Sequence, residues 1–154
     1  MSKTRAAWSI PTWFFLHGFA EKINETYYNN NYGKCFNIIR RICNNIPCEI
    51  CRTHASYKMK LTKDHMINTK EKLINFLFDF HNEVSQRVGN TMFDKTILIK
   101  YKTYNIRKGY DYFVKSYFKK YYSLNFYQWI RDKFLDDLNE EMETIWEFLD
   151  YDNN

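Results

Sequence analysis

Glycine and proline are scarce in this chain, and their scarcity limits the folds that it can adopt. The 154 residues include 4 glycines and 2 prolines. Because these residues make most tight turns and interrupt helices, their low number disfavours a many-stranded sheet and favours helices. Hydrophobic residues make up 45% of the chain, which argues against disorder and is enough for the core of one domain. We therefore expect an all-α fold.

The charges are unevenly distributed along the chain. The formal net charge is +5, yet half of the 18 acidic residues lie between Asp132 and Asp152, whereas residues 95–120 are basic. These two segments can neutralise each other, so the sequence does not predict nucleic-acid binding. The sequence also shows no apolar run of membrane-spanning length and no cleavable signal peptide. We therefore expect a soluble, cytoplasmic protein that does not insert into membranes.

The clearest helical pattern lies at about residues 69–88. There Leu73, Leu77, Phe80 and Val84 recur at steps of three and four residues, which places them on one face of a helix. Similar but weaker patterns predict the helices and loops of the rest of the chain. The other expected elements are a loose arm at 1–8, helices at about 11–23, 34–44 and 48–59, a polar loop at 29–33, a basic helix at about 110–121 and an acidic helix at about 126–148.

A pair of cysteines, Cys48 and Cys51, follows Pro47 at the start of a predicted helix. A helix N-terminus stabilises negative charge, so it favours the thiolate of a cysteine placed there. Such a pair is typical of a redox disulfide or of half a zinc site. Arg52 and His54 follow closely and could lower the pKa of a thiol in the pair, or could be solvated surface residues.

Cys35 and Cys43 lie eight residues apart on one predicted helix. Eight residues of helix rise by about 12 Å, whereas the Cα atoms of a disulfide lie within about 7 Å of each other. The two cysteines therefore cannot pair within a continuous helix, and we expect two buried thiols.

Polar side chains interrupt the apolar faces of two predicted helices. His17 lies one turn from Trp13 on the first helix, and His81 and Ser85 lie one turn apart on the 69–88 helix, with Asn82 beside them. Buried polar groups need hydrogen-bond partners. A bound cofactor could supply these partners, and so could hydrogen bonds between helices.

Three segments, in this order, resemble motifs of the Erv/ALR family of sulfhydryl oxidases. They are Trp8–Ala20, which reads WSIPTWFFLHGFA, Pro47–Cys51, which reads PCEIC, and His81–Gly89, which reads HNEVSQRVG and is followed by Phe93. The resemblance covers about Trp8 to Tyr101. The chain is most similar to members carried by large DNA viruses, which implies a viral protein of the host cytoplasm or the virion.

The resemblance implies a four-helix bundle plus a short fifth helix, non-covalently bound FAD and a homodimer. It implies that the chain forms disulfides in protein substrates and passes the electrons to oxygen, giving hydrogen peroxide. Cys48 would exchange with the substrate and Cys51 would lie against the flavin ring. The residues that the resemblance assigns to FAD binding are Trp8, Trp13, His17, His81, Asn82, Val84 and Ser85.

The chain departs from the family pattern at two places in the third motif. Ser85 stands where the family has asparagine, and Asn90-Thr91 stands where it has lysine-proline, so Lys95 or Lys100 could replace the missing cation. No cysteine follows Cys51, so electrons would come directly from a thiol-containing protein, such as a redox carrier with its own CxxC.

We therefore expect an oxidase domain at residues 1–101 and a helical extension at residues 102–154, packed on the same domain. The alternative is an interaction module stabilised by zinc. Its ligands would be Cys48, Cys51, His54 and Cys43.

Overall fold

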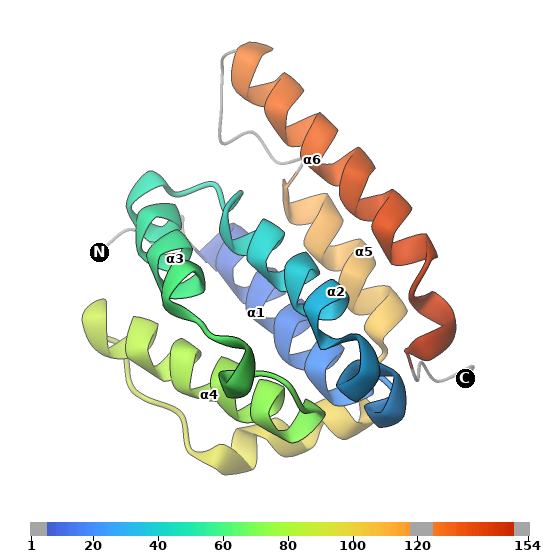
Figure 1. Ribbon diagram of the computed structural model, residues 1–154. Coiled ribbons are helices and arrows are strands. Elements are labelled where there is room, and N and C mark those ends of the chain that lie inside the picture. The colour runs from blue at the N-terminus through green and yellow to red at the C-terminus, as the bar shows by residue number, and fades with distance from the viewer. Residues whose placement is uncertain (1–5, 118–124, 150–154) are drawn as a thin grey trace.

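The computed structural model describes residues 6–117 and 125–149, and these residues form a bundle of helices (Figure 1). The all-α prediction is confirmed: within the described ranges, the one β-type pairing is an isolated bridge between Ile23 and Leu149. The α-helices are α1 (Ala6–Lys22), α2 (Glu25–Cys43), α3 (Glu49–Leu61), α4 (Lys70–Arg87), α5 (Ile106–Tyr117) and α6 (Asn125–Glu143). The 3-10 helices are η2 (Asp64–Met66), η3 (Lys95–Thr103) and η4 (Trp146–Phe148).

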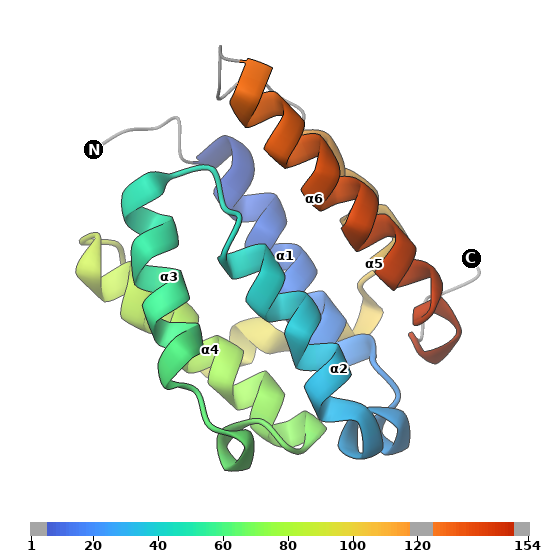
Figure 2. The same cartoon turned by 45° about the horizontal axis from the view of Figure 1, so that its top comes forward.

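Helix α1 lies at the centre of the bundle, where it packs against α4 on one side and α5 on the other (Figures 1 and 2). Helix α2 packs against α3 and α4, and η3 crosses one end of the bundle against α1. Large apolar side chains of α1 and α2, including Phe15, Phe19 and Phe36, are almost completely buried. In the described part of the chain, no helix is both long and apolar enough to cross a membrane.

Two helix starts differ from the prediction. Helix α1 begins at Ala6 rather than near residue 11, with Pro11 inside the helix, because burial of the Trp8 side chain offsets the backbone hydrogen bond that proline removes. Helix α2 begins at Glu25 and includes the segment that was expected to be a loop. The helix is kinked at Asn31, within the asparagine-rich sequence. The side-chain amide of Asn31 donates to the carbonyl of Tyr27.

The extension packs directly on the centre of the bundle. Helix α5 lies along α1, and the ring of Tyr104 fits over Gly18 of α1 and Gly109 of α5. A Cβ atom at either glycine would overlap the Tyr104 ring, so this close approach requires glycine on both helices. The Nζ of Lys22 donates to the carbonyl of Lys102 at 2.6 Å and fixes η3 to the end of α1.

Helix α6 ends at Glu143, so the acidic helix is shorter than the predicted 126–148. The last residues of the predicted range form a turn and η4 instead. Arg41 of α2 pairs with Glu141, and the Tyr110 hydroxyl of α5 donates to Asn139. Buried residues of α5 and α6 belong to the same hydrophobic core as α1. The predicted boundary at residue 101 stays a prediction. The predicted helical residues 118–121 lie outside the described ranges.

Candidate functional site

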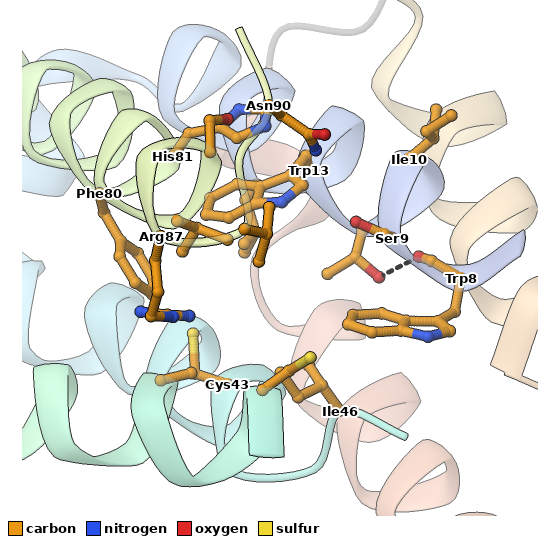
Figure 3. A pocket seen from close by; sticks show the side chains of 17 residues that line it. Trp8, Ser9, Ile10, Trp13, Cys43, Ile46, Phe80, His81, Arg87 and Asn90 are labelled. Atoms are coloured by element: carbon orange, nitrogen blue, oxygen red, sulfur yellow. Dashed lines mark hydrogen bonds between the residues drawn. The ribbon is translucent and has the colours of Figure 1, made fainter. Parts of the chain in front are cut away.

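A cavity of about 300 Å³ lies between the first half of α1, the start of α3 and the end of α4 (Figure 3). Its volume is at the lower end of the range typical of small-molecule sites. The structure brings six of the predicted site residues to its wall: Trp8, Trp13, Cys51, His81, Val84 and Ser85. Three others, Cys48, His17 and Asn82, do not line the cavity. What each of these residues does stays a prediction at this point.

Cys48 and Cys51 form a disulfide, with 5.2 Å between their Cα atoms. Cys48 is the N-cap residue of α3, and the backbone N–H of Cys51 donates to its sulfur at 3.3 Å. This geometry gives a reduced Cys48 both a hydrogen-bond donor and the positive end of a helix dipole, which stabilise a thiolate. Cys51 faces the cavity, so the two sulfur atoms have different surroundings.

Trp13, His17 and His81 form a stacked group between α1 and α4. The Trp13 and His81 rings are nearly parallel, with centroids 4.0 Å apart and 5° between their planes. The Nε2 of His17 and the Nδ1 of His81 lie 2.9 Å apart, which is a hydrogen bond with one ring as donor and the other as acceptor. His17 is buried, and its hydrogen-bond partner is His81. Of the two kinds of partner that the sequence allowed for His17, a cofactor or another helix, the described chain shows a hydrogen bond between helices.

Burial lowers the pKa of both histidines. The pKa of His17 falls to about 3, because of desolvation first and then the nearby His81 and Lys100. The pKa of His81 falls to about 4, because of desolvation and Lys100. Both rings are therefore neutral at pH 7, and a neutral pair can form the single hydrogen bond that the geometry shows. Trp13 and His81, which are nearly parallel, therefore give the cavity a flat, uncharged face.

We expect the protein to lose stability as the pH falls from about 6.5 to about 4. Unfolded histidine has a pKa near 6.5, so in this window the unfolded chain binds protons that His17 and His81 exclude while folded. The loss at pH 5 should be about 2 kcal/mol for each histidine. Urea unfolding at pH 7 and pH 5 measures it, and equal midpoints would contradict the neutral pair. His81→Gln should reduce the pH dependence.

Asn82 holds the segment after α4 in place. Its side-chain amide donates to the carbonyl of Phe93 at 3.1 Å, and its oxygen accepts from the Phe93 N–H at 2.8 Å. The Phe93 ring then packs against His81, with 4.7 Å between centroids. Helix α4 ends as the sequence predicts, with Gly89 at a φ of 78°. Asn82 thus holds Phe93 against the outer side of His81, and its contact with a cofactor stays a prediction.

Two groups that the sequence did not assign to the site also line the cavity. Cys43 reaches it from the end of α2, and Arg87 reaches it from the end of α4 (Figure 3). Cys43 and Cys35 are buried and form no disulfide, which confirms the expectation of two buried thiols. Burial raises the pKa of the Cys43 thiol to about 12. The sequence named Cys43 as a buried thiol and as a ligand in the zinc alternative, and it did not point to Arg87, because contact across three helices leaves no local pattern.

The position of the missing family lysine also lies at the cavity. Asn90 is part of the wall, and Arg87 is the cationic side chain among the described lining residues. Of the two lysines proposed as replacements, Lys100 has its Nζ 4.5 Å from the centre of the Phe14 ring, and neither it nor Lys95 lines the cavity. Arg87 is therefore the better-placed cation.

The described residues also bear on the zinc alternative. No group of three or more His, Cys, Asp or Glu side chains comes together within these ranges in a way that could hold a metal. His54 is exposed, and both cysteines of the pair are in the disulfide. The donor set that the zinc module needs is therefore not assembled in this part of the chain.

The wall of the cavity fits a planar redox cofactor. Trp8, Trp13 and Phe80 give it large aromatic surfaces, His81 is neutral, and Arg87 supplies one positive charge at the rim. Aromatic walls bind a flat ring by stacking, and a cation suits a phosphate. A sulfur of the disulfide lies at the same wall, so electrons could pass between the disulfide and a bound ring without a mobile carrier.

Residues 10–107 match the model of the Erv1 / Alr family. The chain is 28% identical over 104 residues to a protein of Invertebrate iridescent virus 3 named "Putative FAD-linked sulfhydryl oxidase 096R". That alignment covers 66% of this chain and 70% of the viral protein. No solved structure matches the chain.

Proposed function

The chain belongs to the Erv1/Alr family, whose members are FAD-linked sulfhydryl oxidases, and on this premise we propose that it is an FAD-dependent thiol oxidase. It would oxidise a pair of thiols in a protein substrate to a disulfide. The overall reaction consumes the dithiol and one oxygen molecule and yields the disulfide and hydrogen peroxide, so atoms and electrons balance.

One observation carries the proposal: Cys51 of the disulfide lines the same cavity as Trp13 and His81. A structural disulfide needs no aromatic cavity beside one of its sulfur atoms. A redox disulfide needs one sulfur accessible to the substrate and the other beside the electron acceptor. The different surroundings of Cys48 and Cys51 support this division of roles.

The exchange step follows from the geometry at the start of α3. A substrate thiolate attacks the Sγ of Cys48, the bond between Cys48 and Cys51 breaks, and Cys51 leaves as a thiolate. The second substrate thiolate then attacks the substrate sulfur in the mixed disulfide and releases Cys48 as a thiolate. The N–H of Cys51 and the helix dipole stabilise that leaving group.

The residues at the cavity wall would bind the cofactor. We assign Trp8, Trp13 and His81 to stacking and packing against its rings, Val84 and Ser85 to its edge, and Arg87 to its phosphates. Held by these residues, FAD would supply the electron acceptor for the reduced cysteine pair, with oxygen as the final acceptor.

His17 and Asn82 would act through His81, which His17 contacts from one side and the Asn82–Phe93 pair holds from the other. The homodimer and the redox carrier with its own CxxC that the resemblance implies stay predictions.

We expect the purified protein to be yellow and to lose its flavin when the wall is changed. His81→Ala and Trp13→Ala remove stacking surface, so flavin per chain should fall strongly in both. Added FAD at 100 times its Kd should stabilise the wild-type protein by about 2.7 kcal/mol, because it binds only the folded state. Visible absorbance and thermal unfolding with and without FAD measure both effects.

Matched controls exist for both variants. His65→Ala and Trp129→Ala change the same residue types at exposed positions outside the cavity, and both should keep full flavin occupancy. Full occupancy in His81→Ala and Trp13→Ala as well would remove the basis for placing FAD in this cavity.

A further inference from the structure

A second cavity lies on the other side of the redox loop, which is the segment 44–48 between α2 and α3. It has a volume of about 240 Å³ and is formed jointly by the redox loop, the start of α3 and the C-terminal extension. We call it the extension groove. It is lined by Asn44, Asn45, Pro47, Arg52, Tyr117, Ile130, Arg131 and Phe134.

Neighbouring residues around the disulfide line different cavities. Ile46 and Cys51 line the candidate cofactor cavity, whereas Pro47 and Arg52, each one residue later, line the extension groove. Cys48, the sulfur that would exchange with the substrate, directly follows Pro47 and lines neither cavity. A substrate segment in the groove would therefore lie beside Cys48 and be separated from the cofactor by the disulfide.

Two arginines line the groove, Arg52 and Arg131, and Arg52 is held in position by the redox loop. The Nη1 of Arg52 donates to the carbonyl of Ile46 at 3.0 Å, and the described residues show no other hydrogen bond for this side chain. An arginine has five N–H donors in a fixed plane, so further donors remain for a ligand. None of the described residues that line the groove is acidic. A carboxylate is the group that an arginine in this setting binds best.

The wall that belongs to α6 combines two apolar side chains, Ile130 and Phe134, with the buried Arg131. Ile130 is 38% exposed and Phe134 is buried against α5, with 5.6 Å between the Phe134 and Tyr117 rings. Trp129, next to Ile130, is 63% exposed. Apolar side chains beside two arginines suit an extended peptide segment that carries both an apolar and an acidic side chain.

We propose that the extension groove is the docking site for the thiol-containing protein substrate and selects a segment with an acidic side chain beside its reactive cysteine. This inference rests on the proposed thiol oxidase function. It gives the C-terminal extension a role in substrate selection in addition to its place in the core.

The test compares two synthetic peptides with the same Cys-X-X-Cys core, one flanked by glutamates and the other by lysines. For the wild-type protein, kcat/KM should be about tenfold higher for the acidic peptide, the effect of one charge-assisted hydrogen bond. Arg52→Glu should bring the ratio below one. Because the ratio is taken within each variant, any general effect of Arg52 on the thiols cancels.

Ile130 allows a matched pair of variants at one position. Ile130→Glu should lower the acidic-to-basic ratio and Ile130→Lys should raise it, while both should oxidise dithiothreitol at the wild-type rate. Two distant variants control for long-range charge effects: Lys60→Glu at the end of α3 and Ile99→Glu on η3, both at exposed positions. Both should keep the wild-type ratio.

The outcomes separate this proposal from the proposed function. A wild-type ratio near one, a ratio unchanged in Arg52→Glu and Ile130→Glu, or an equal change in Lys60→Glu would overturn the groove. So would a change of oligomeric mass in Ile130→Glu, since a second copy would then occupy the groove. If wild-type protein fails to oxidise dithiothreitol, the proposed function fails. The docking proposal is then tested by fluorescence anisotropy with Cys→Ser versions of the acidic and basic peptides. Equal affinity for these two peptides would overturn the docking proposal.

Discussion

Cys51→Ser should accumulate a mixed disulfide at Cys48 and lose all turnover of dithiothreitol. In the wild-type protein, the Cys51 thiol can break any mixed disulfide that forms at Cys48 and release the exchange partner. The serine hydroxyl cannot do this, so an adduct with glutathione should persist after the variant is treated with glutathione disulfide. Intact-mass spectrometry should find one adduct per chain, and peptide mapping should place it on Cys48.

Two further variants test the division of roles between the cysteines. Cys48→Ser should also lose turnover but should keep its flavin and carry far less adduct, since Cys51 faces the cavity. A variant with both Cys35→Ser and Cys43→Ser should oxidise dithiothreitol nearly as well as the wild type, because neither cysteine is in the disulfide. If that double variant kept flavin but lost turnover, one of the two would be a relay and the direct route would be wrong.

The second large effect concerns the extension: Phe113→Ala in α5 should destabilise the whole protein by about 3–5 kcal/mol. Phe113 is completely buried and stacks on Phe15 of α1, with 5.3 Å between ring centroids. Its loss leaves a cavity against the central helix, and total stability of a domain is only about 5–15 kcal/mol. Urea unfolding followed by circular dichroism measures the change.

Tyr112→Ala is the matched control on the same helix. Tyr112 is 53% exposed, so its removal should change stability by less than about 0.5 kcal/mol. A small effect of Phe113→Ala, or two separate unfolding transitions, would show that the extension folds apart from the bundle. A single transition shifted to lower urea would show that residues before and after the predicted boundary form one cooperative unit.

The parts of the fold that the sequence predicted well are those with strong local patterns. The 69–88 helix was expected from its apolar spacing, and α4 spans Lys70–Arg87. The start of α1 and the kink in α2 were missed, because burial of Trp8 and Tyr28 outweighs the local preferences of proline and asparagine. The packing of Tyr104 over two glycines on different helices has no local signal.

The candidate site shows the same limit. The resemblance pointed to Trp13, Cys51 and His81, and all three line the cavity. The sequence could not tell that Arg87 would be the cation at its wall or that Asn82 would bind the backbone of Phe93, because both depend on how α4 ends. The sequence also could not predict that His17 and His81 are neutral, because the desolvation that lowers their pKa depends on how the helices pack.

Burial of Cys43 has a consequence for how long such a protein could keep working. A thiol oxidase makes hydrogen peroxide, and peroxide oxidises cysteine through the thiolate form. Cys43 lines the cavity, yet its pKa of about 12 keeps its thiolate at roughly one part in 10⁵ near pH 7. If the proposed function holds, the packing that buries this sulfur at the cavity wall also protects it from the peroxide that the reaction would make. A protonated Cys43 thiol at the cavity wall would therefore not be a site at which peroxide inactivates the protein.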